Sequence, residues 1–191
     1  PGVEIKGGVC YFLWERDYSG ECEITNIDKN KKNVLKKKLI ENNLNFFIRY
    51  NQSISIIKKI LKHDEKKIDS LISPMKPFGF RTFFKGNKNK NKNSIKIFHN
   101  GGEGYVPNNE IKMNKEIIDK HKIFISRGYG AGESFPHQIL NKPFYGEPGS
   151  VCTETYIYIG PFKSKKVCEN VISYIKTKFF RFLVLLIKNT Q

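Results

Sequence analysis

Short apolar runs at the start of the chain predict a β-hairpin. Val9–Trp14 is rich in β-prone side chains, and Glu21–Ile27 alternates polar and apolar positions. Between them, Asp17–Gly20 has the composition of a turn. The apolar face of this hairpin has no partner nearby in the sequence, so we expect it to pack poorly against the rest of the chain.

Helical periodicity appears in three places. Asn51–Lys62 places isoleucine and leucine at 3.6-residue spacing behind a polar cap, which predicts an amphipathic helix, and Lys66–Ile72 predicts a short second piece. Ser164 is a candidate cap for a long C-terminal helix that ends at about Ile187. The expected buried stripe of this helix is Val167, Val171, Tyr174, Ile175, Phe179, Phe182 and Leu186.

Between these helices, β-prone runs alternate with turn residues. Ile95–Phe98, Tyr105–Val106, Lys122–Ile125 and Thr153–Ile159 are predicted strands, and Asn114–His121 is a predicted helix. From about residue 46 onward we therefore expect a mixed sheet with helices. The fold class that follows is α+β.

Charge points to a polyanionic partner. The 191 residues include 34 Lys and Arg against 18 Asp and Glu, a net charge of +16, and 39% are hydrophobic, which is enough to build a core. Lys29–Lys38 contains six lysines and is expected to be a solvated loop or strand edge. Lys85–Asn93 is of low complexity and is expected to be an exposed, mobile hairpin tip.

Several functional classes find no match in the residues. The most apolar run, Phe179–Ile187, has nine residues and contains Arg181, so it is too short for a membrane span. Four cysteines without a C-x-x-C pair argue against structural zinc and are expected to be free cytosolic thiols. The four histidines are scattered, and we assign no nucleophile.

The glycine-rich segment Ser126–His137 is the most unusual part of the sequence. Gly128–Gly132 follows a predicted strand, but Pro136 comes too early for the helix that a cofactor loop requires. We therefore interpret it as a flexible contact loop in which Arg127 and Tyr129 could meet bases or phosphates, with a structural glycine turn as the alternative.

Two near matches to catalytic motifs are interpreted as chance. Asn141–Phe144 lacks one proline of the Asn-Pro-Pro-Tyr tetrapeptide of amino-methyltransferases and is taken as a turn. Glu4-Ile-Lys6 and Glu110-Ile-Lys112 match the Glu-x-Lys part of a nuclease site, but no Pro-Asp precedes either. A lysine-rich chain produces such triplets by chance.

Four segments carry a family resemblance: Pro1–Trp14, Arg127–Gln138, Gly146–Tyr156 and Ser173–Leu183. They resemble the C-terminal part of adenine-specific DNA methyltransferases of type II restriction-modification systems, the TaqI-like group. Pro1–Trp14 resembles the segment that closes the catalytic domain in this family. The resemblance extends over nearly the whole chain.

The resemblance implies two domains. Residues 1–28 correspond to the terminal hairpin of the methyltransferase sheet, and residues 29–191 to a DNA target-recognition domain with a mixed sheet and a long C-terminal helix. In such families the cofactor loop and the Asn-Pro-Pro-Tyr motif lie upstream, and Pro1 corresponds to the proline after the aromatic residue that stacks on the flipped adenine. The chain is therefore expected to be a fragment that binds no cofactor and is inactive alone.

The expected partners are double-stranded DNA and the catalytic methyltransferase domain upstream in the same polypeptide, with no membrane. S-adenosylmethionine belongs to the parent protein, and the expected location is the cytoplasm of a bacterium or archaeon. The predicted DNA-binding residues are Arg127, Tyr129, Gln138, Arg81, Lys36, Lys37, Lys88 and Lys90. The alternatives are a restriction nuclease half, a basic RNA-binding module, and a lysine-rich structural fragment without a partner of its own.

Overall fold

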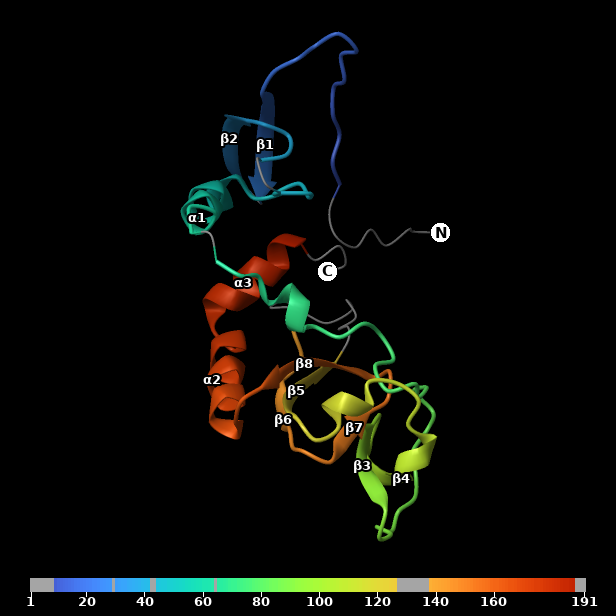
Figure 1. Cartoon of the computed structure of the whole chain (residues 1–191). Helices are drawn as coiled ribbons and strands as arrows, with labels where there is room; N and C mark the ends of the chain where they lie inside the picture. The colour runs from blue at the N-terminus through green and yellow to red at the C-terminus, as the bar shows by residue number, and fades with distance from the viewer. Residues whose placement is uncertain (1–8, 29, 42–43, 64, 127–137, 188–191) are drawn as a thin grey trace, which may run out of the picture. The chain divides into compact units, whose positions relative to one another are not determined.

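The structure is a computed structural model that describes residues 9–28, 30–41, 44–63, 65–126 and 138–187. Within these residues it is an α+β protein with three small sheets and three α-helices (Figure 1). The chain divides into two compact units. The first unit comprises residues 1–66, 130–137 and 182–191, and the second unit comprises residues 67–129 and 138–181. The α+β class that the sequence predicts is confirmed.

The first unit is built on a two-stranded antiparallel sheet. Strand β1 (Cys22–Asp28) pairs with β2 (Lys31–Lys37), so that Ile24 lies opposite Leu35. A 3-10 turn, η1 (Asn51–Ser53), leads into helix α1 (Ile54–Ile60), which confirms the predicted amphipathic helix. The core of this unit consists of Ile48, Ile54, Ile57 and Leu186, with Leu35, Leu44, Phe46, Ile60, Phe182 and Leu183 packed around them.

The N-terminal hairpin predicted from the sequence is wrong in its first strand. Val9–Trp14 forms no strand, and its large apolar side chains are more than 70% exposed, whereas β1 pairs with the lysine-rich segment that we expected to be a solvated loop or strand edge. Only two residues separate β1 from β2, and a short connection closes a hairpin at a lower entropic cost than a long one. The predicted domain boundary after residue 28 falls at this connection.

Asparagine side chains join the hairpin of the first unit to the segment before α1. The Asn51 backbone N–H donates to Oδ1 of Asn26 over 2.7 Å, and Nδ2 of Asn26 donates to the Arg49 carbonyl over 2.8 Å. Asn51 Nδ2 donates in turn to the Ile24 and Asn33 carbonyls. These bonds tie both strands of the hairpin to residues 49 and 51, and they satisfy the Asn51 N–H and the Arg49 carbonyl.

The second unit contains two three-stranded sheets. The first has the order β4-β3-β7, with β3 antiparallel to β4 and parallel to β7, and the second has the order β6-β5-β8 and is antiparallel. The strands are β3 (Ser94–His99), β4 (Gly102–Pro107), β5 (His121–Ser126), β6 (Phe144–Gly146), β7 (Ser150–Cys152) and β8 (Tyr156–Phe162). The predicted strands at 95–98, 105–106 and 122–125 are confirmed.

Strand β5 is the centre of this unit because it is buried on both faces. Phe124 belongs to a core that also contains Ile97 and Val151 of the other sheet. Ile123 and Ile125 point the other way, into a second core with side chains of helix α2 (Lys165–Ile175). The alternation along one strand therefore produces a layered arrangement of sheet, sheet and helix.

The long C-terminal helix is interrupted. Ser164 caps α2 as predicted, accepting from the Val167 N–H at 3.3 Å, but α2 ends at Ile175 and α3 (Lys178–Ile187) follows after two residues. Thr177 explains the break, because its hydroxyl accepts from the Phe180 N–H at 3.2 Å and so starts a new helix.

Three further predictions are corrected in detail. In the predicted buried stripe, Val167, Tyr174 and Phe179 are exposed, and Cys168 is buried instead. The predicted helix at 114–121 is a single 3-10 turn, η4 (Lys115–Ile117), because strand β5 begins at His121. The predicted strand at 153–159 begins at Tyr156, because Thr153 makes a turn in which its hydroxyl bonds to Thr155.

The remaining 3-10 turns are η2 (Ile68–Leu71), within the predicted second helical piece, and η3 (Asn108–Glu110). Among the residues that the structure describes, no helix is long and apolar enough to cross a membrane.

Candidate functional site

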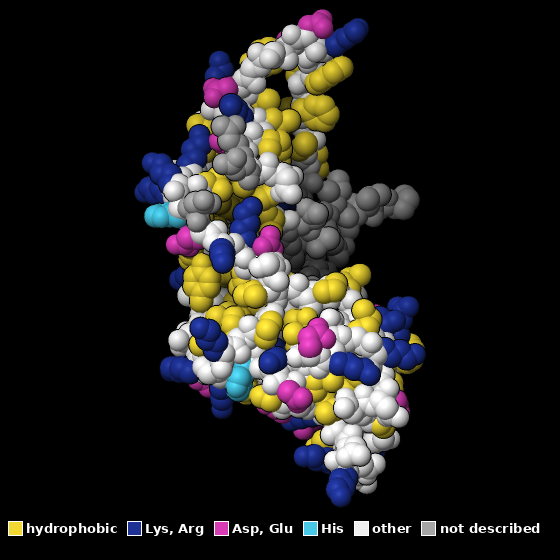
Figure 2. Space-filling model, in the orientation of Figure 1, with side chains coloured by type: hydrophobic (Ala, Val, Ile, Leu, Met, Phe, Trp, Pro, Cys, Tyr) yellow, Lys and Arg dark blue, Asp and Glu magenta, His cyan; other side chains and the backbone are white. Residues whose placement is uncertain are grey.

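The residues 85–93, called the lysine loop below, form a concentrated basic surface in the second unit. All nine are exposed, and the sequence from Arg81 to Gly102 contains no aspartate or glutamate. Among the described residues, none of the lysines at 85, 88, 90 and 92 forms an ion pair. Figure 2 shows Lys and Arg side chains at several separate places on the face in view. The lysine loop therefore presents positive charge that no neighbouring carboxylate offsets.

Both ends of the lysine loop are fixed to the sheet. Asn87 and Tyr105 exchange backbone hydrogen bonds of 2.7 and 2.9 Å, which attaches the start of the loop to β4. This close approach requires Gly86, whose φ is +69°, and Gly104, where a Cβ would clash with the Lys85 carbonyl. At the other end, the Ser94 hydroxyl accepts from the Asn91 N–H at 2.9 Å. The loop is exposed as predicted, but it precedes the β3–β4 hairpin and is not its tip.

Arg81 lies close to the lysine loop in the sequence and is held by Glu154. Its guanidinium is 3.5 Å from Oε2 of Glu154, and its side chain remains 62% exposed. The other carboxylate oxygen accepts from the Thr82 N–H and hydroxyl at 3.1 and 3.2 Å. These contacts orient Arg81 and offset part of its charge, so Arg81 offers less net positive charge to an anion than each lysine of the loop does.

The two lysines predicted to contact DNA on β2 differ sharply. Lys36 is exposed and lies opposite Glu23 in the antiparallel register. Lys37 is only 3% exposed, because its Nζ donates to the Ile48 carbonyl at 3.0 Å and lies over the Phe47 ring. Burial lowers the pKa of Lys37. Side chains alternate between the two faces of a strand, and Lys37 lies on the inner face. It therefore stabilises the first unit and is not a surface cation.

Of the three residues predicted to read bases, Arg127 and Tyr129 lie outside the described residues. Gln138 is described and is half-buried. Its Nε2 donates to the Leu140 carbonyl at 3.1 Å and to Oδ1 of Asn141 at 2.7 Å. In this arrangement Gln138 holds the segment that leads into β6.

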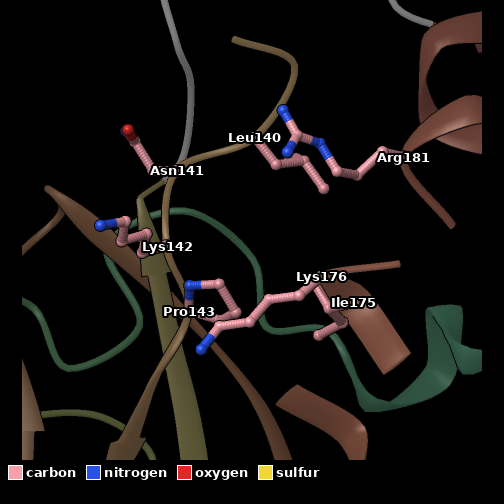
Figure 3. Close-up of a pocket in the computed structure, with 7 residues that line it drawn as sticks. All are labelled: Leu140, Asn141, Lys142, Pro143, Ile175, Lys176 and Arg181. Carbon is pink, nitrogen blue, oxygen red and sulfur yellow. The ribbon is translucent and has the colours of Figure 1, made fainter. Parts of the chain in front are cut away.

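This segment and the junction between α2 and α3 enclose a partly open pocket of about 330 Å³ (Figure 3). The lining consists of Leu140, Asn141, Lys142, Pro143, Ile175, Lys176 and Arg181. Three of these residues are cationic and none is acidic. No pattern in the sequence predicts this pocket, because its two segments are far apart in the chain and residues 141–143 have the composition of a turn.

Two other lysines of the second unit are internal supports. Lys122 is fully buried, and its Nζ donates to the carbonyls of Ile118, Lys120 and Glu147 at 2.9, 2.9 and 3.2 Å. Burial lowers the pKa of Lys122 to about 8. Lys96 Nζ pairs with the carboxylates of Glu103 and Glu147 at 2.8 and 3.3 Å, and the hydrogen bond that it donates to Glu103 is the main cause of its raised pKa.

The described residues contain no cluster of three or more His, Cys, Asp or Glu side chains that could hold a metal ion. Cys152 and Cys168 are buried, and burial raises the pKa of each thiol. His121 Nδ1 is 2.6 Å from the Tyr145 hydroxyl, and the two rings stack. The described surface offers lysine and arginine side chains that can bind anions.

Comparison with models of protein families finds no match to this chain, and searches of curated proteins and of solved structures find none either.

Proposed function

We propose that this chain binds double-stranded DNA with sequence specificity, as the target-recognition part of an adenine-specific DNA methyltransferase in a restriction-modification system. The observation that carries the DNA-binding part is the lysine loop, whose exposed lysines form no ion pair among the described residues. Lysines on phosphates release counterions from the duplex, which gives affinity without reading sequence.

The attachment of the lysine loop to β4 favours the binding of DNA phosphates by the loop. A loop fixed at both ends by Asn87–Tyr105 and Ser94–Asn91 hydrogen bonds loses less conformational entropy when its lysines meet phosphates. Arg81, oriented by Glu154, can add a contact of fork geometry from the same unit. Phosphate contacts of this kind set the position of a protein on DNA.

The finer organisation rests on the family resemblance. In this proposal residues 1–28 adjoin an upstream catalytic domain, and residues 29–191, together with β1, which pairs with β2, form the target-recognition domain with its mixed sheet and C-terminal helical region. S-adenosylmethionine and methyl transfer belong to the catalytic domain of the parent protein. Base reading is assigned to Arg127 and Tyr129, outside the described residues.

The test is binding of the full chain to a fluorescent duplex at several salt concentrations. We expect an affinity that falls steeply with salt, with a log-log slope of about 0.9 for each phosphate contact. A structured RNA of equal length is the control. Tighter binding to the RNA would favour the RNA-binding alternative, and no binding to either would reject the proposal.

Sequence specificity has a separate test. If Arg127 reads a base edge, Arg127→Ala should cost about 1–3 kcal/mol on a cognate site selected from a random duplex library and much less on random DNA. Arg81→Ala is the matched control, because Arg81 is proposed to contact phosphate only and its loss should weaken binding to both DNAs equally. An equal loss on both DNAs would make Arg127 a phosphate contact, and no loss would leave the glycine-rich segment a structural turn.

A further inference from the structure

Phe83 is an exposed aromatic residue that lies two positions before the lysine loop. It is 82% exposed, whereas Phe80 and Phe84 on either side of it belong to the core of the second unit, with their rings stacked at 4.6 Å between centroids. A single exposed apolar side chain is common on protein surfaces and by itself indicates nothing. What distinguishes Phe83 is the fixed turn that carries it and the positive charge on both sides.

The turn that carries Phe83 is held at several points. The Phe84 N–H donates to the Arg81 carbonyl at 3.1 Å, so Thr82 and Phe83 are the central residues of a β-turn. The Glu154 carboxylate accepts from the Thr82 N–H and hydroxyl at 3.1 and 3.2 Å. A side chain on a fixed backbone loses less conformational entropy on binding than one on a mobile loop. The turn therefore presents the Phe83 ring to solvent in a position suited to binding.

Positive residues lie on both sides of this ring. Arg81 precedes Phe83 by two positions, and Lys85 follows it by two. Because consecutive Cα atoms are about 3.8 Å apart, both of these Cα atoms lie within about 7.6 Å of the Phe83 Cα. Lys85 is exposed and forms no ion pair among the described residues, and the Arg81 side chain stays mostly exposed beside Glu154. The chain itself therefore keeps two cationic residues next to an exposed aromatic ring.

An aromatic ring with cations beside it is complementary to a nucleic-acid strand. A base offers a flat face on which the ring can stack, and the phosphates on either side of the base attract the cations. In an intact duplex the neighbouring base pairs cover that face. An aromatic side chain therefore reaches it where a base is unpaired or where the step is opened.

We propose that Phe83 stacks on a base of the bound DNA at a position where the base has left the regular stack, while Lys85 and Arg81 contact phosphates beside it. This inference rests on the proposed function, because it requires that the chain binds duplex DNA. It adds a preference for the structure of the DNA, which the phosphate contacts of the lysine loop do not provide.

The experiment compares two short fluorescent duplexes of the same sequence by anisotropy with the full chain. One duplex is fully paired, and in the other the base opposite a central adenine is missing. Both carry the same number of phosphates, so lysine and arginine contribute equally to the binding of each. We expect the duplex with the unpaired adenine to bind about tenfold more tightly, the order of magnitude for stacking one base on an aromatic side chain.

Variants assign this preference to one ring. Phe83→Ala should remove the preference and leave the affinity for the paired duplex nearly unchanged, and Phe83→Trp should retain the preference because it keeps an aromatic face. Phe12→Ala is the matched control, because Phe12 is 83% exposed in the first unit, and it should change neither affinity. Lys85→Ser should weaken binding to both duplexes equally, as the loss of a phosphate contact does.

The outcomes separate this inference from the proposed function. If the paired duplex binds but the unpaired adenine brings no gain, or if the gain survives in Phe83→Ala, the stacking role of Phe83 is overturned and DNA binding stands. An equal loss on both duplexes in Phe83→Ala would also overturn it, because a stacking contact acts on the unpaired base alone. If neither duplex binds, the proposed function and this inference fail together.

Discussion

The two lysine-rich segments of the chain have similar compositions and different structures. Strand β2 (Lys31–Lys37) is paired with β1 in the first unit, and one of its lysines is buried. The lysine loop of the second unit (85–93) is exposed throughout, although its ends are fixed to β4 and β3. The difference shows that lysine density alone does not make a binding surface. What matters is whether apolar neighbours place the segment in a sheet and whether carboxylates face it.

Carboxylates distinguish the two segments further. In the register of the first sheet, Glu23 lies opposite Lys36 and Asp28 opposite Lys31. Opposite charges across a strand pair offset one another in part. The lysine loop has no acidic residue within it or on either side for several positions. We therefore expect DNA binding to depend more on the lysine loop than on β2.

The largest effect should come from removing whole clusters. Replacing the lysines at 85, 88, 90 and 92 by serine should reduce duplex affinity at physiological salt on the order of a hundredfold and lower the salt slope by about 3 to 4 units. Replacing the lysines at 31, 32, 36 and 38, which removes the same charge, should have a clearly smaller effect. Fluorescence anisotropy over a salt series measures both. A larger loss from the β2 variant would reverse the comparison.

Within β2, replacing the buried lysine should lower the stability of the protein more than replacing its exposed neighbour. Lys37→Met removes the donor to the Ile48 carbonyl and the contact with the Phe47 ring, so we expect it to lower the free energy of unfolding by about 1–2 kcal/mol. Lys36→Met, at the neighbouring exposed position, should change it by less than about 0.5 kcal/mol. Urea unfolding of the two variants measures the difference. Equal stabilities would mean that Lys37 contributes no more than an exposed lysine.

Much of the second unit was predictable because the β propensity of its strand sequences agrees with the burial of these strands in the fold. Strand β5 has an apolar run of strand length, and its neighbours bury both faces. The first hairpin was not predictable, because Val9–Trp14 has a stronger β propensity than the lysine-rich segment that actually pairs with β1. The pocket was invisible for another reason. Its lining joins residues 140–143 with Ile175, Lys176 and Arg181, and only tertiary packing brings these two parts of the sequence together.

Lys122 is a lysine of a third kind. It is buried, and among the described residues it forms no ion pair with a carboxylate. Its pKa is lowered to about 8 from a usual value of 10.5 by burial. Below pH 8 the lysine is protonated in both the folded and the unfolded state, and the folded state bears the cost of a buried charge. Between pH 8 and 10.5 the folded state loses this proton first, so the contribution of Lys122 to stability rises with pH.

We expect this rise to be about 1 kcal/mol between pH 8 and pH 9. Ionisation of Cys152 in the unfolded state opposes part of this rise as the pH approaches 9, because burial raises the pKa of that thiol in the folded state from a usual value of 9.0. Urea unfolding at several pH values, with Lys122→Met as the control, isolates the slope. The same slope in both proteins would show that the titration of Lys122 does not contribute to it.

The smallest effect compares one lysine from each segment. Lys88→Ser should lower the salt slope of duplex binding by about 0.9 units, the amount for one phosphate contact. Lys36→Ser should lower it by less, because Glu23 lies opposite and already offsets part of that charge. The single variant Glu23→Gln sharpens the comparison. Without the carboxylate, a lysine at position 36 becomes a full phosphate-binding charge, so Glu23→Gln alone should raise the slope toward the value expected for one additional contact. If Lys36→Ser changes the slope as much as Lys88→Ser does, the carboxylate opposite Lys36 does not weaken its contact with DNA, and the distinction between the two segments fails.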